Sequence, residues 1–436
     1  MGIRNGFALE ELPENVRQIY EYITAGGYKV YLVGGCIRDR LLSKEPEDWD
    51  MVTNAPADFI KSLPYRVVTP GERYGAFKVI INKIPYDVTT FREGTIHQDL
   101  LHRDFTVNAV AYDLGRGTFL DPAGGIDDLL KHRVIRAVDS PEERFTEDPL
   151  RVLRGIRFSV ELGFPIEVKT YNAIKAMALR LKGVSPERIK DEFNRIILSE
   201  KIEKGIRLLK DSGLLKVIIP ELLEGEGITQ RGDHMYDVLE HNIKTAAYVR
   251  RDLSLRLAGL LHDVGKPRTL KEGEGGRSFP GHHIESAVLA GKILKRMKYP
   301  TRVIKEVVSL INNHLFIYNK KTPERELRKL MADLGEEGIF RLIELLYADR
   351  KAINPAVVLD YVEKLEKRVR EVLMSEGIIR IRDLEINGND VKEVLNKKSG
   401  PEIGYVLKDL WEKVIDDPSL NKREILLKML EKYQGQ

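Results

Sequence analysis

The stretch VYLVGGCIRDRLLSKEPEDWDMVT, residues 30–53, decides the expected fold of the first part of the chain. Residues 28–33 are rich in β-branched and aromatic side chains, which predicts a buried strand, and Gly34 and Gly35 predict a turn into a helix. Glycines let backbone N–H groups approach a ligand at a helix N-terminus, where the helix dipole favours anions. Arg38, one turn into that helix, would add a bidentate phosphate donor. The pattern predicts half of a nucleotide site.

Two carboxylates, Asp48 and Asp50, supply the other half. They flank Trp49 just before residues 51–53, which have strand composition, so we expect both carboxylates on one face and Trp49 on the other. Neighbouring carboxylates repel unless a cation lies between them, and oxygen ligands suit Mg²⁺. Paired ions about 3.5 to 4 Å apart can activate a hydroxyl and stabilise the leaving oxygen of a phosphoryl displacement. A lone DxD is more often a polar capping loop, but the preceding GGxxRD favours metal binding.

Composition limits the number of domains and the classes of protein that the sequence can encode. A chain of 436 residues can bury several cores, which predicts three or four domains. The balance of 71 basic against 67 acidic residues gives a net charge of +4, which permits RNA binding without arguing for it. A single cysteine excludes an internal disulfide framework. Without a signal peptide or a long apolar run, the sequence predicts a soluble cytoplasmic protein.

The segments LVGGCIRDRLL and EDWDMVT together resemble the signature of the class II tRNA nucleotidyltransferase and bacterial poly(A) polymerase family, within the DNA polymerase β-like superfamily. The resemblance implies an α/β head with a small mixed sheet, two Mg²⁺ ions on Asp48 and Asp50, and attack of an RNA 3′-hydroxyl on the α-phosphate of CTP or ATP. It implies tRNA, CTP and ATP as partners, and neither DNA nor a membrane. Asp87, in an expected hairpin of residues 76–81 and 84–90, matches a further carboxylate position of the family; a strand-edge charge is the equal alternative.

A second motif of the family matches HRDFTVN, residues 102–108. The resemblance implies that Arg103 holds the triphosphate and that Asn108 contacts the ribose, where a bond to the 2′-hydroxyl distinguishes RNA precursors; helix capping is the alternative for Asn108. Family members that complete the CCA end carry a long flexible loop before this motif. Here the short segment EGTIHQDLLH stands in its place, and His102 replaces an arginine, which resembles enzymes that add only CC.

Base choice is expected in EDPLRVLRGIRF, residues 147–158, read as one helix. Asp148, Arg151, Arg154 and Arg157 recur every three residues, a spacing that alone favours a solvated charged stripe. The family's EDxxR motif instead implies that Asp148 accepts from the exocyclic amine of cytosine or adenine while Arg151 donates to the ring nitrogen. Guanine and uracil present oxo groups there, a mismatch that can discriminate roughly 10⁴-fold. Arg154 and Arg157 would neutralise phosphates, although Arg157 could equally be a packing arginine.

The predicted architecture has four domains in line. Residues 1–137 form the nucleotidyltransferase head, 138–225 an all-α neck with the nucleotide-selection helix, 226–355 an HD-type helical body, and 356–436 a helical tail. The tail is rich in lysine and resembles the segment by which the family grips the elbow of tRNA. Its lysines would contact phosphates without reading sequence, so the affinity would depend on salt.

The body carries a second set of chemically active side chains. In chain order they are His241, His262, Asp263, His282, His314 and Asp349. A lone histidine on an apolar helix is usually a core residue, but this order resembles the HD phosphohydrolase superfamily, whose helical bundle holds a divalent metal. The resemblance implies His241, His262, Asp263 and Asp349 as ligands.

The sequence therefore predicts a tRNA nucleotidyltransferase that adds C and A residues to the tRNA 3′ end without a nucleic acid template. CC-only addition and poly(A) synthesis share the same chemistry and remain alternatives. Two alternatives belong to other classes: a metal-dependent phosphohydrolase acting through the body, and an RNA-binding protein with an inactive head. The intact Asp48, Asp50, Asp148 and Arg151 argue against an inactive head.

Overall fold

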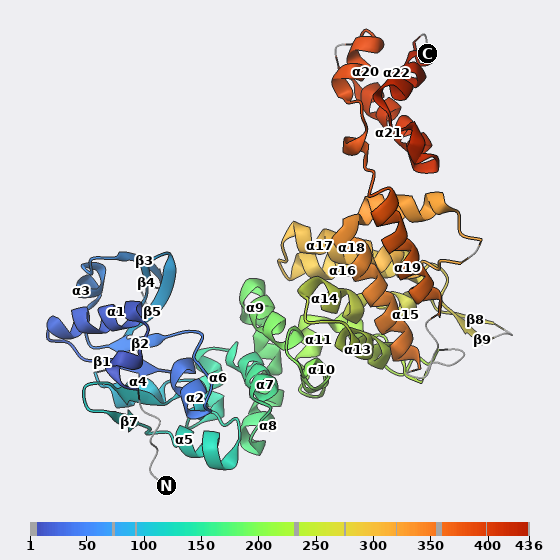
Figure 1. Ribbon diagram of the computed structural model, residues 1–436. Helices are drawn as coiled ribbons and strands as arrows, with labels where there is room; N and C mark the ends of the chain where they lie inside the picture. Colours follow the sequence, from blue (N-terminus) through green and yellow to red (C-terminus); the bar gives the residue numbers. More distant parts are fainter. Residues whose placement is uncertain are drawn as a thin grey trace. The chain divides into compact units, whose positions relative to one another are not determined.

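The structure is a computed structural model that describes residues 7–71, 75–91, 94–230, 235–273, 276–319, 321–354, 360–397 and 399–434. The chain divides into two compact units, residues 1–218 and 219–436. The first unit runs from blue to green in Figure 1, and the second from green to red.

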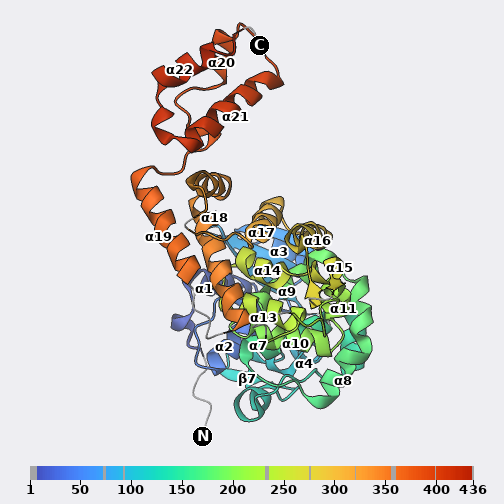
Figure 2. The same ribbon diagram turned by 90° about the vertical axis from the view of Figure 1, so that its right-hand side faces the viewer.

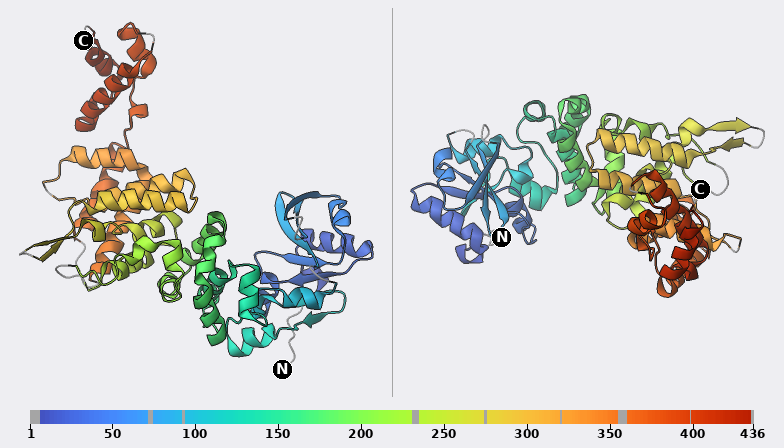
Figure 3. Two further views of the ribbon diagram at one scale, coloured as in Figure 1. Left: turned by 180° about the vertical axis from the view of Figure 1, so that it is seen from behind. Right: turned by 90° about the horizontal axis from the view of Figure 1, so that it is seen from above.

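The first unit contains a mixed sheet, drawn as blue arrows in Figure 3. In the described part of the chain this sheet has seven strands in the order β3-β4-β5-β2-β1-β6-β7. The strands are β1 Val30–Val33, β2 Asp50–Thr53, β3 Arg66–Gly71, β4 Ala76–Ile81, β5 Ile84–Thr90, β6 Ala111–Asp113 and β7 Thr118–Leu120. Only the β2–β5 pair is parallel within this sheet. The predicted hairpin is confirmed: Asn82 and Lys83 have φ of 51° and 68°, which a two-residue type I′ turn requires.

All four residues of the central strand β1 are buried, because helices cover both faces of the sheet there. Helix α4 (Ile96–Leu101) packs on one face through Ile96 and Leu100. Helix α1 (Glu14–Ala25), near the start of the chain, is amphipathic. Its buried residues are Val16, Ile19 and Ile23.

The other α-helices of the first unit lie between the strands in sequence or form a helical neck after the sheet. They are α2 Gly35–Leu41, α3 Ala57–Lys61, α5 Gly125–Asp127, α6 Pro141–Glu147, α7 Arg151–Leu162, α8 Val168–Met177, α9 Pro186–Ile197, α10 Ile202–Asp211 and α11 Leu215–Ile218. Helix α7 packs against α9 and α10. This packing places charged side chains of α7 beside those of α9.

The second unit is mainly helical. Its first helices are α12 Pro220–Leu223, α13 Val238–Tyr248, α14 Leu253–Leu261, α15 Lys266–Thr269, α16 His282–Arg296, α17 Thr301–Asn313, α18 Glu324–Ile353 and α19 Asp360–Ser375. A small hairpin of β8 (Lys271–Gly273) and β9 (Gly276–Ser278) follows α15. Gly335 interrupts α18 with φ 73°. Helix α19 lies alongside α18 (Figure 2), where Arg350 donates to the Tyr361 hydroxyl at 3.0 Å.

The end of the chain forms three more helices with a core of their own. These are α20 Gly388–Val394, α21 Pro401–Asp416 and α22 Arg423–Glu431. Leu410, Val414 and Leu426 are fully or almost fully buried in that core. Arg328 of α18 pairs with Glu376 at 2.7 Å, and Lys329 pairs with Glu412 at 2.6 Å.

The predicted fold class, an α/β head followed by a helical body, is confirmed. The composition of residues 133–137 predicts a further strand, and this prediction is wrong. The segment makes isolated bridges through Ile135 and Ala137, because Arg133 with φ 51° bends the chain. The four predicted domain boundaries stay predictions. Among the described helices, none has the length and apolar character needed to cross a bilayer.

Two expectations about site segments also need correction. The helix expected over residues 147–158 begins only at Arg151, because Asp148 has an extended backbone (φ −143°, ψ 101°) after α6 ends. Strand β2 begins at Asp50. Asp48 and Trp49 therefore precede the strand, and strand alternation does not place them.

Candidate active site

The glycine turn after β1 brings the backbone close to the predicted carboxylates. Gly34 has φ 74° and ψ −127°, a conformation that residues with a side chain rarely adopt. A Cβ on Gly34 would lie 3.3 Å from Oδ2 of Asp50 and 3.3 Å from Nη1 of Arg103. Gly35 begins α2, and its Cβ would lie 3.8 Å from Nη2 of Arg38. The turn thus lets a carboxylate, two guanidinium groups and the backbone meet in a small space.

The carboxylates form a cluster at the start of β2. Asp50 and Asp87 are paired in register on the parallel strands β2 and β5, so their side chains leave the same face of the sheet. Burial raises the pKa of Asp50 to about 6; Arg103 opposes the shift, and Asp87 and Asp48 add to it. Asp87 is exposed and pairs with Lys78 at 2.9 Å. A divalent cation bound between these carboxylates would offset their mutual repulsion, and carboxylate oxygens are ligands that Mg²⁺ prefers. These residues therefore fit Mg²⁺.

Polar side chains extend from the carboxylates towards the neck. Arg103 Nη2 lies 3.5 Å from Oδ2 of Asp99, and Arg103 Nε has no hydrogen-bond partner among the described residues. Arg38 donates to Oδ1 of Asn108 at 3.1 Å. Asn108 donates in turn to Oδ1 of Asp104 at 3.4 Å. The predicted triphosphate and ribose contacts therefore belong to one connected network.

The network continues into α7 and α9. Arg154 Nη2 lies 2.6 Å from Oδ2 of Asp104, and although burial acts in the opposite direction, Arg154 lowers the pKa of Asp104 to about 2. Glu192 of α9 accepts from Arg154 at 3.4 Å and lies 3.0 Å from Nε of Arg157. Burial lowers the pKa of Arg157 to about 10, and its guanidinium lies 4.0 Å from the ring centroid of Phe158. These buried contacts exclude a solvated charged stripe.

Groups outside the predicted base-reading pair hold both of its side chains in place. Arg151 is 7% exposed and donates to Oε2 of Glu147 at 2.8 Å and to the His102 carbonyl at 2.9 Å. Asp148 accepts from Nη1 and Nη2 of Arg188 at 3.3 and 2.7 Å. Burial raises the pKa of Asp148, but Arg188 outweighs it and lowers the pKa below the ordinary value.

Sequence reasoning did not single out Arg188 or Glu192. Both lie on α9, four residues apart in the segment SPERIKDEF, so they share one face of that helix. Glu147 was quoted only as part of a motif. The i, i+4 spacing of Arg188 and Glu192 could have indicated that they act together. The sequence did not show that this face of α9 packs against α7.

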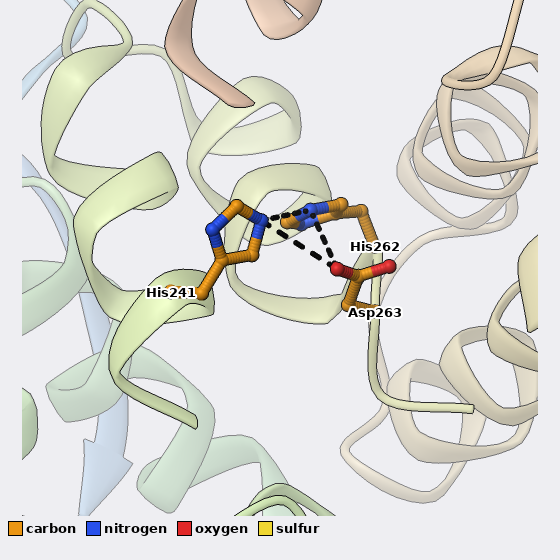
Figure 4. Close-up of side chains that lie close together, drawn as sticks. All are labelled: His241, His262 and Asp263. Carbon is orange, nitrogen blue, oxygen red and sulfur yellow. Dashed lines mark hydrogen bonds and ion pairs between the residues drawn. The ribbon is translucent and has the colours of Figure 1, made fainter. Parts of the chain in front are cut away.

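The second unit brings together the histidines and aspartates predicted for the body. His241 lies on α13, His262 and Asp263 follow α14, and Asp349 lies near the end of α18. The side chains of His241, His262 and Asp263 point towards one another (Figure 4). Nε2 of His241 lies 3.1 Å from Nε2 of His262 and 2.9 Å from Oδ1 of Asp349. All four predicted ligands therefore converge.

The charged side chains of this buried cluster stabilise one another electrostatically. Burial lowers the pKa of His262, but Asp263 and Asp349 outweigh it and raise the pKa to about 10. Burial lowers the pKa of His314 to about 4. His314 and His282 face the other oxygen of Asp263, Oδ1, at 3.7 and 3.2 Å. The residues thus offer imidazole and carboxylate ligands of the kind that divalent transition metals prefer.

Three families match the chain. The poly A polymerase head domain matches residues 30–136. The probable RNA and SrmB-binding site of polymerase A matches residues 163–225, and the putative tRNA nucleotidyltransferase domain 2 matches residues 282–430. The A-adding tRNA nucleotidyltransferase of Deinococcus radiodurans is 34% identical over 404 residues, which cover 87% of this chain and 90% of that protein. This chain belongs to the tRNA nucleotidyltransferase family.

Other members of the tRNA nucleotidyltransferase family cover the chain to a similar extent. The CC-adding tRNA nucleotidyltransferase of Thermus thermophilus is 32% identical to this chain, in an alignment that covers 87% of this chain and 88% of that enzyme. The CCA-adding enzyme of Enterococcus faecalis is 30% identical, with coverages of 95% and 94%. The crystal structure of the Bacillus stearothermophilus CCA-adding enzyme in complex with CTP shares the fold with a TM-score of 0.70, at 25% identity and coverages of 97% and 98%. As a member of this family, the chain is a nucleotidyltransferase.

Proposed function

We propose that this chain adds C and A residues to the 3′ end of tRNA from CTP and ATP, with protein side chains in place of a template. One observation carries the proposal. The consecutive residues His102 and Arg103 join the two halves of the site, since the His102 carbonyl accepts from Arg151 and the Arg103 guanidinium lies beside Asp50 at the Gly34 turn. The base-reading arginine and the carboxylates are thereby fixed relative to one another.

The head residues divide the work of phosphoryl transfer. Asp48 and Asp50 would hold two Mg²⁺ ions, which supply charge stabilisation to attack on the α-phosphate, and Asp87 would support them. The tRNA 3′-oxygen loses its proton and bonds to the α-phosphorus of the nucleotide, while the bond to the β-phosphate breaks and pyrophosphate leaves. Arg103, whose guanidinium lies beside Asp50 at the Gly34 turn, would hold the triphosphate. Because Gly34 and Gly35 have no side chains, they leave room for the triphosphate beside Arg103.

Arg38 and Asn108 would complete the binding of the nucleotide. Arg38 is positioned by Asn108 and by Asp39 at 2.8 Å, so it can meet a phosphate without first becoming ordered. The side-chain amide of Asn108 hydrogen-bonds to both Arg38 and Asp104. A ribose hydroxyl would form a further hydrogen bond to the same amide.

Base selection depends on two side chains whose rotamers are already fixed. Glu147 and the His102 carbonyl hold Arg151, and Arg188 holds Asp148. Preorganised donors and acceptors discriminate better than mobile ones, because less order is lost on binding. Arg154 is about one-third exposed and would neutralise phosphates. Arg157, buried against Phe158, fits the alternative of a packing arginine.

A specific observation favours CC-only addition as a second candidate. The short segment before His102 is mostly helix α4, with Ile96 and Leu100 buried against the sheet. Residues 92 and 93 lie outside the described residues. A packed helix cannot rearrange as a long loop would, so the switch from C to A addition would have to come from other residues.

The proposed RNA-binding surfaces lie in two separate parts of the sequence. We assign tRNA contact to the neck, which matches an RNA-binding family, and contact with the tRNA elbow to the tail, whose lysines would bind phosphates. The cytoplasmic location stays a prediction.

We also propose that the body binds one divalent metal through His241, His262, Asp263 and Asp349, and that phosphoester hydrolysis is its activity. The supporting observation is the spacing of the ligand atoms. His262 Nε2 lies 3.4 Å from carboxylate oxygens of both Asp263 and Asp349, close to the separation of about 3.4 Å expected for tetrahedral ligands about 2.1 Å from a metal.

The direct test uses tRNA transcripts that end before the CCA sequence, after C, and after CC, each with single labelled nucleotides. The proposal predicts C on the first two and A on the third. A stop after two C residues would establish CC-only addition, and long A tails on unrelated RNA would establish poly(A) synthesis. The Asp48→Ala, Asp50→Ala double variant is the control, and it should add nothing.

A further inference from the structure

We propose that Arg144 of α6 is a positioning residue for base selection, because it holds both Glu147 and His102, the two residues that orient Arg151. The inference rests on the proposed function, in which Arg151 donates to the ring nitrogen of cytosine or adenine. Arg144 precedes the motif segment of residues 147–158. It would act through Arg151 and not by contact with the nucleotide.

Arg144 is a buried charge whose side chain joins two separate segments. The residue is 6% exposed, although α6 ends only three residues later, at Glu147. Its Nη1 donates at 3.2 Å to the carbonyl of Leu101, the last residue of α4. Its Nη2 pairs with Oε1 of Glu147 at 2.9 Å. A buried guanidinium needs such partners to compensate its charge, so Arg144 ties the end of α4 to the end of α6.

Glu147 is shared between two arginines, with one carboxylate oxygen facing each. Oε1 faces Arg144 at 2.9 Å, and Oε2 accepts from Nη1 of Arg151 at 2.8 Å. The Glu147 side chain is 38% exposed. Without Arg144 it could turn towards water and lose the rotamer that faces Arg151, because an exposed ion pair alone is weak. Arg144 therefore fixes the carboxylate that fixes the base-reading arginine.

Backbone carbonyls provide a second connection between Arg144 and Arg151. Nη1 of Arg151 donates to the carbonyl of Arg144 itself at 3.2 Å. Nη2 of Arg151 donates to the His102 carbonyl at 2.9 Å. The residue that supplies one acceptor thus also contacts the two residues that supply the others.

The contact with His102 also fixes the state of the imidazole. Nη1 of Arg144 lies 3.0 Å from Nδ1 of His102. A guanidinium has only donors, so Nδ1 accepts and the proton of the neutral ring lies on Nε2. An arginine at position 102, as in the family motif, could not accept from Arg144. The contact therefore depends on the histidine that this chain carries.

These contacts predict how the loss of Arg144 would change base selection. Arg151 would keep its charge and its place at the start of α7, but its guanidinium would sample several orientations. Only one of them meets the ring nitrogen, so order would have to be gained when the nucleotide binds. The carboxylates of the head would be unchanged. KM for CTP should therefore rise, while kcat should change little.

The test compares CTP with 3-deaza-CTP, in which a C–H group replaces the ring nitrogen that Arg151 would contact. Each is given to the full chain with Mg²⁺ and a tRNA that ends before CCA. In the unchanged protein, kcat/KM for CTP should exceed that for the analogue by roughly tenfold or more. In Arg144→Gln this ratio should fall to about twofold, because the contact that the analogue lacks is already weakened.

The matched control is Phe145→Leu, on the same helix. Phe145 is fully buried, and its ring lies 6.3 Å from that of Phe105, measured between centroids. The substitution should loosen the packing of α6 and leave the ratio of CTP to 3-deaza-CTP unchanged. Circular dichroism verifies that each variant is folded.

Arg144→Lys keeps the test decisive if Arg144→Gln does not fold. The lysine retains the positive charge, but its single nitrogen cannot take the places of both Nη atoms, which face Glu147 and the Leu101 carbonyl. The ratio of CTP to 3-deaza-CTP should then lie between those of the unchanged protein and of a protein without the contact. KM for CTP should rise in the same order.

The outcomes separate this inference from the proposed function. Equal use of CTP and 3-deaza-CTP by the unchanged protein, or no addition of either, would overturn base selection by Arg151 and the inference with it. An unchanged ratio in a folded Arg144 variant would overturn the inference alone and leave base selection standing. An equal fall of the ratio in Phe145→Leu would assign the effect to the packing of α6, and would also overturn the role of Arg144.

Discussion

Asp148 presents both carboxylate oxygens to Arg188, which reaches it from α9 at 2.7 and 3.3 Å. The carboxylate that would read an exocyclic amine is therefore oriented by a residue that the family motif does not contain. Since this pair is half exposed, its contribution to stability is small, below about 1 kcal/mol. Its effect should instead appear in base discrimination, which makes Arg188 a positioning residue.

The substitution Arg188→Gln tests this role. Losing both orienting bonds, a pair worth less than about 1 kcal/mol, should lower the preference for CTP over UTP by up to roughly fivefold. KM for CTP should rise more than kcat falls, because the carboxylates of the head are unchanged. Single-nucleotide kinetics on tRNA ending before CCA measure both constants.

The matched control for Arg188 is Arg195→Gln on the same helix. Arg195 pairs with Glu161 at 2.9 Å and is exposed to a similar degree. It lies outside the contacts of Asp148 and Arg151 and should leave discrimination unchanged. Equal loss of selectivity in both variants would show that α9 as a whole, and not Arg188, is responsible.

Asp104 predicts a pH dependence of stability in the first unit. Its folded pKa is lowered to about 2, below the ordinary value, so the ionised form favours the folded state. This stabilisation is complete above about pH 4 and is lost as the pH falls from about 4 towards 2. Its size is about 2 kcal/mol by linkage.

Urea unfolding of the full chain between pH 5 and 2 measures this effect. A Trp411→Phe background leaves Trp49, whose ring packs 5.4 Å from Phe7, as the tryptophan reporting on the first unit. Adding Asp104→Asn should lower stability at pH 5 because it leaves Arg154 with less charge compensation, and should flatten the acid dependence. An unchanged slope below pH 4 would show that Asp104 is not the group that titrates.

At the scale of elements, α4 determines whether the segment before His102 is a packed helix or a mobile loop. Leu100 is fully buried and Ile96 nearly so, so Leu100→Ala should destabilise the first unit by about 2 to 5 kcal/mol. His97 is exposed on the same helix, and His97→Ala should change stability by less than about 0.5 kcal/mol. Thermal unfolding of both variants measures the difference, and equal small effects would support a loop.

Elements with a strong local pattern could be predicted from the sequence. The β4–β5 hairpin and α1 follow from side-chain alternation and a 3.6-residue period, both of which are local properties. The start of α7 was predicted too early, because the run from Asp148 to Arg157 has helical composition. The signal against it is Pro149, since a proline restricts the residue before it, here Asp148, to an extended backbone. By contrast, the Arg154–Glu192 contact could not be predicted, because it depends on which faces of α7 and α9 meet.

At the scale of the whole molecule, the sequence identified two sets of reactive side chains, and the structure places one set in each compact unit. Motif resemblance pointed to the head residues and to the four body residues, and the role of each as a ligand stays a prediction. It did not predict that Asp263 faces two groups of histidines, since that depends on the packing of α14, α16 and α17.

The central claim is that side chains, not a template, choose C and A at the tRNA 3′ end. The most direct measurement sequences the 3′ ends of a tRNA lacking CCA after incubation with the protein, Mg²⁺ and all four nucleoside triphosphates at equal concentration. The account predicts ends of C, CC and CCA, with U and G near background. Unextended ends, or U and G inserted as often as C, would contradict it.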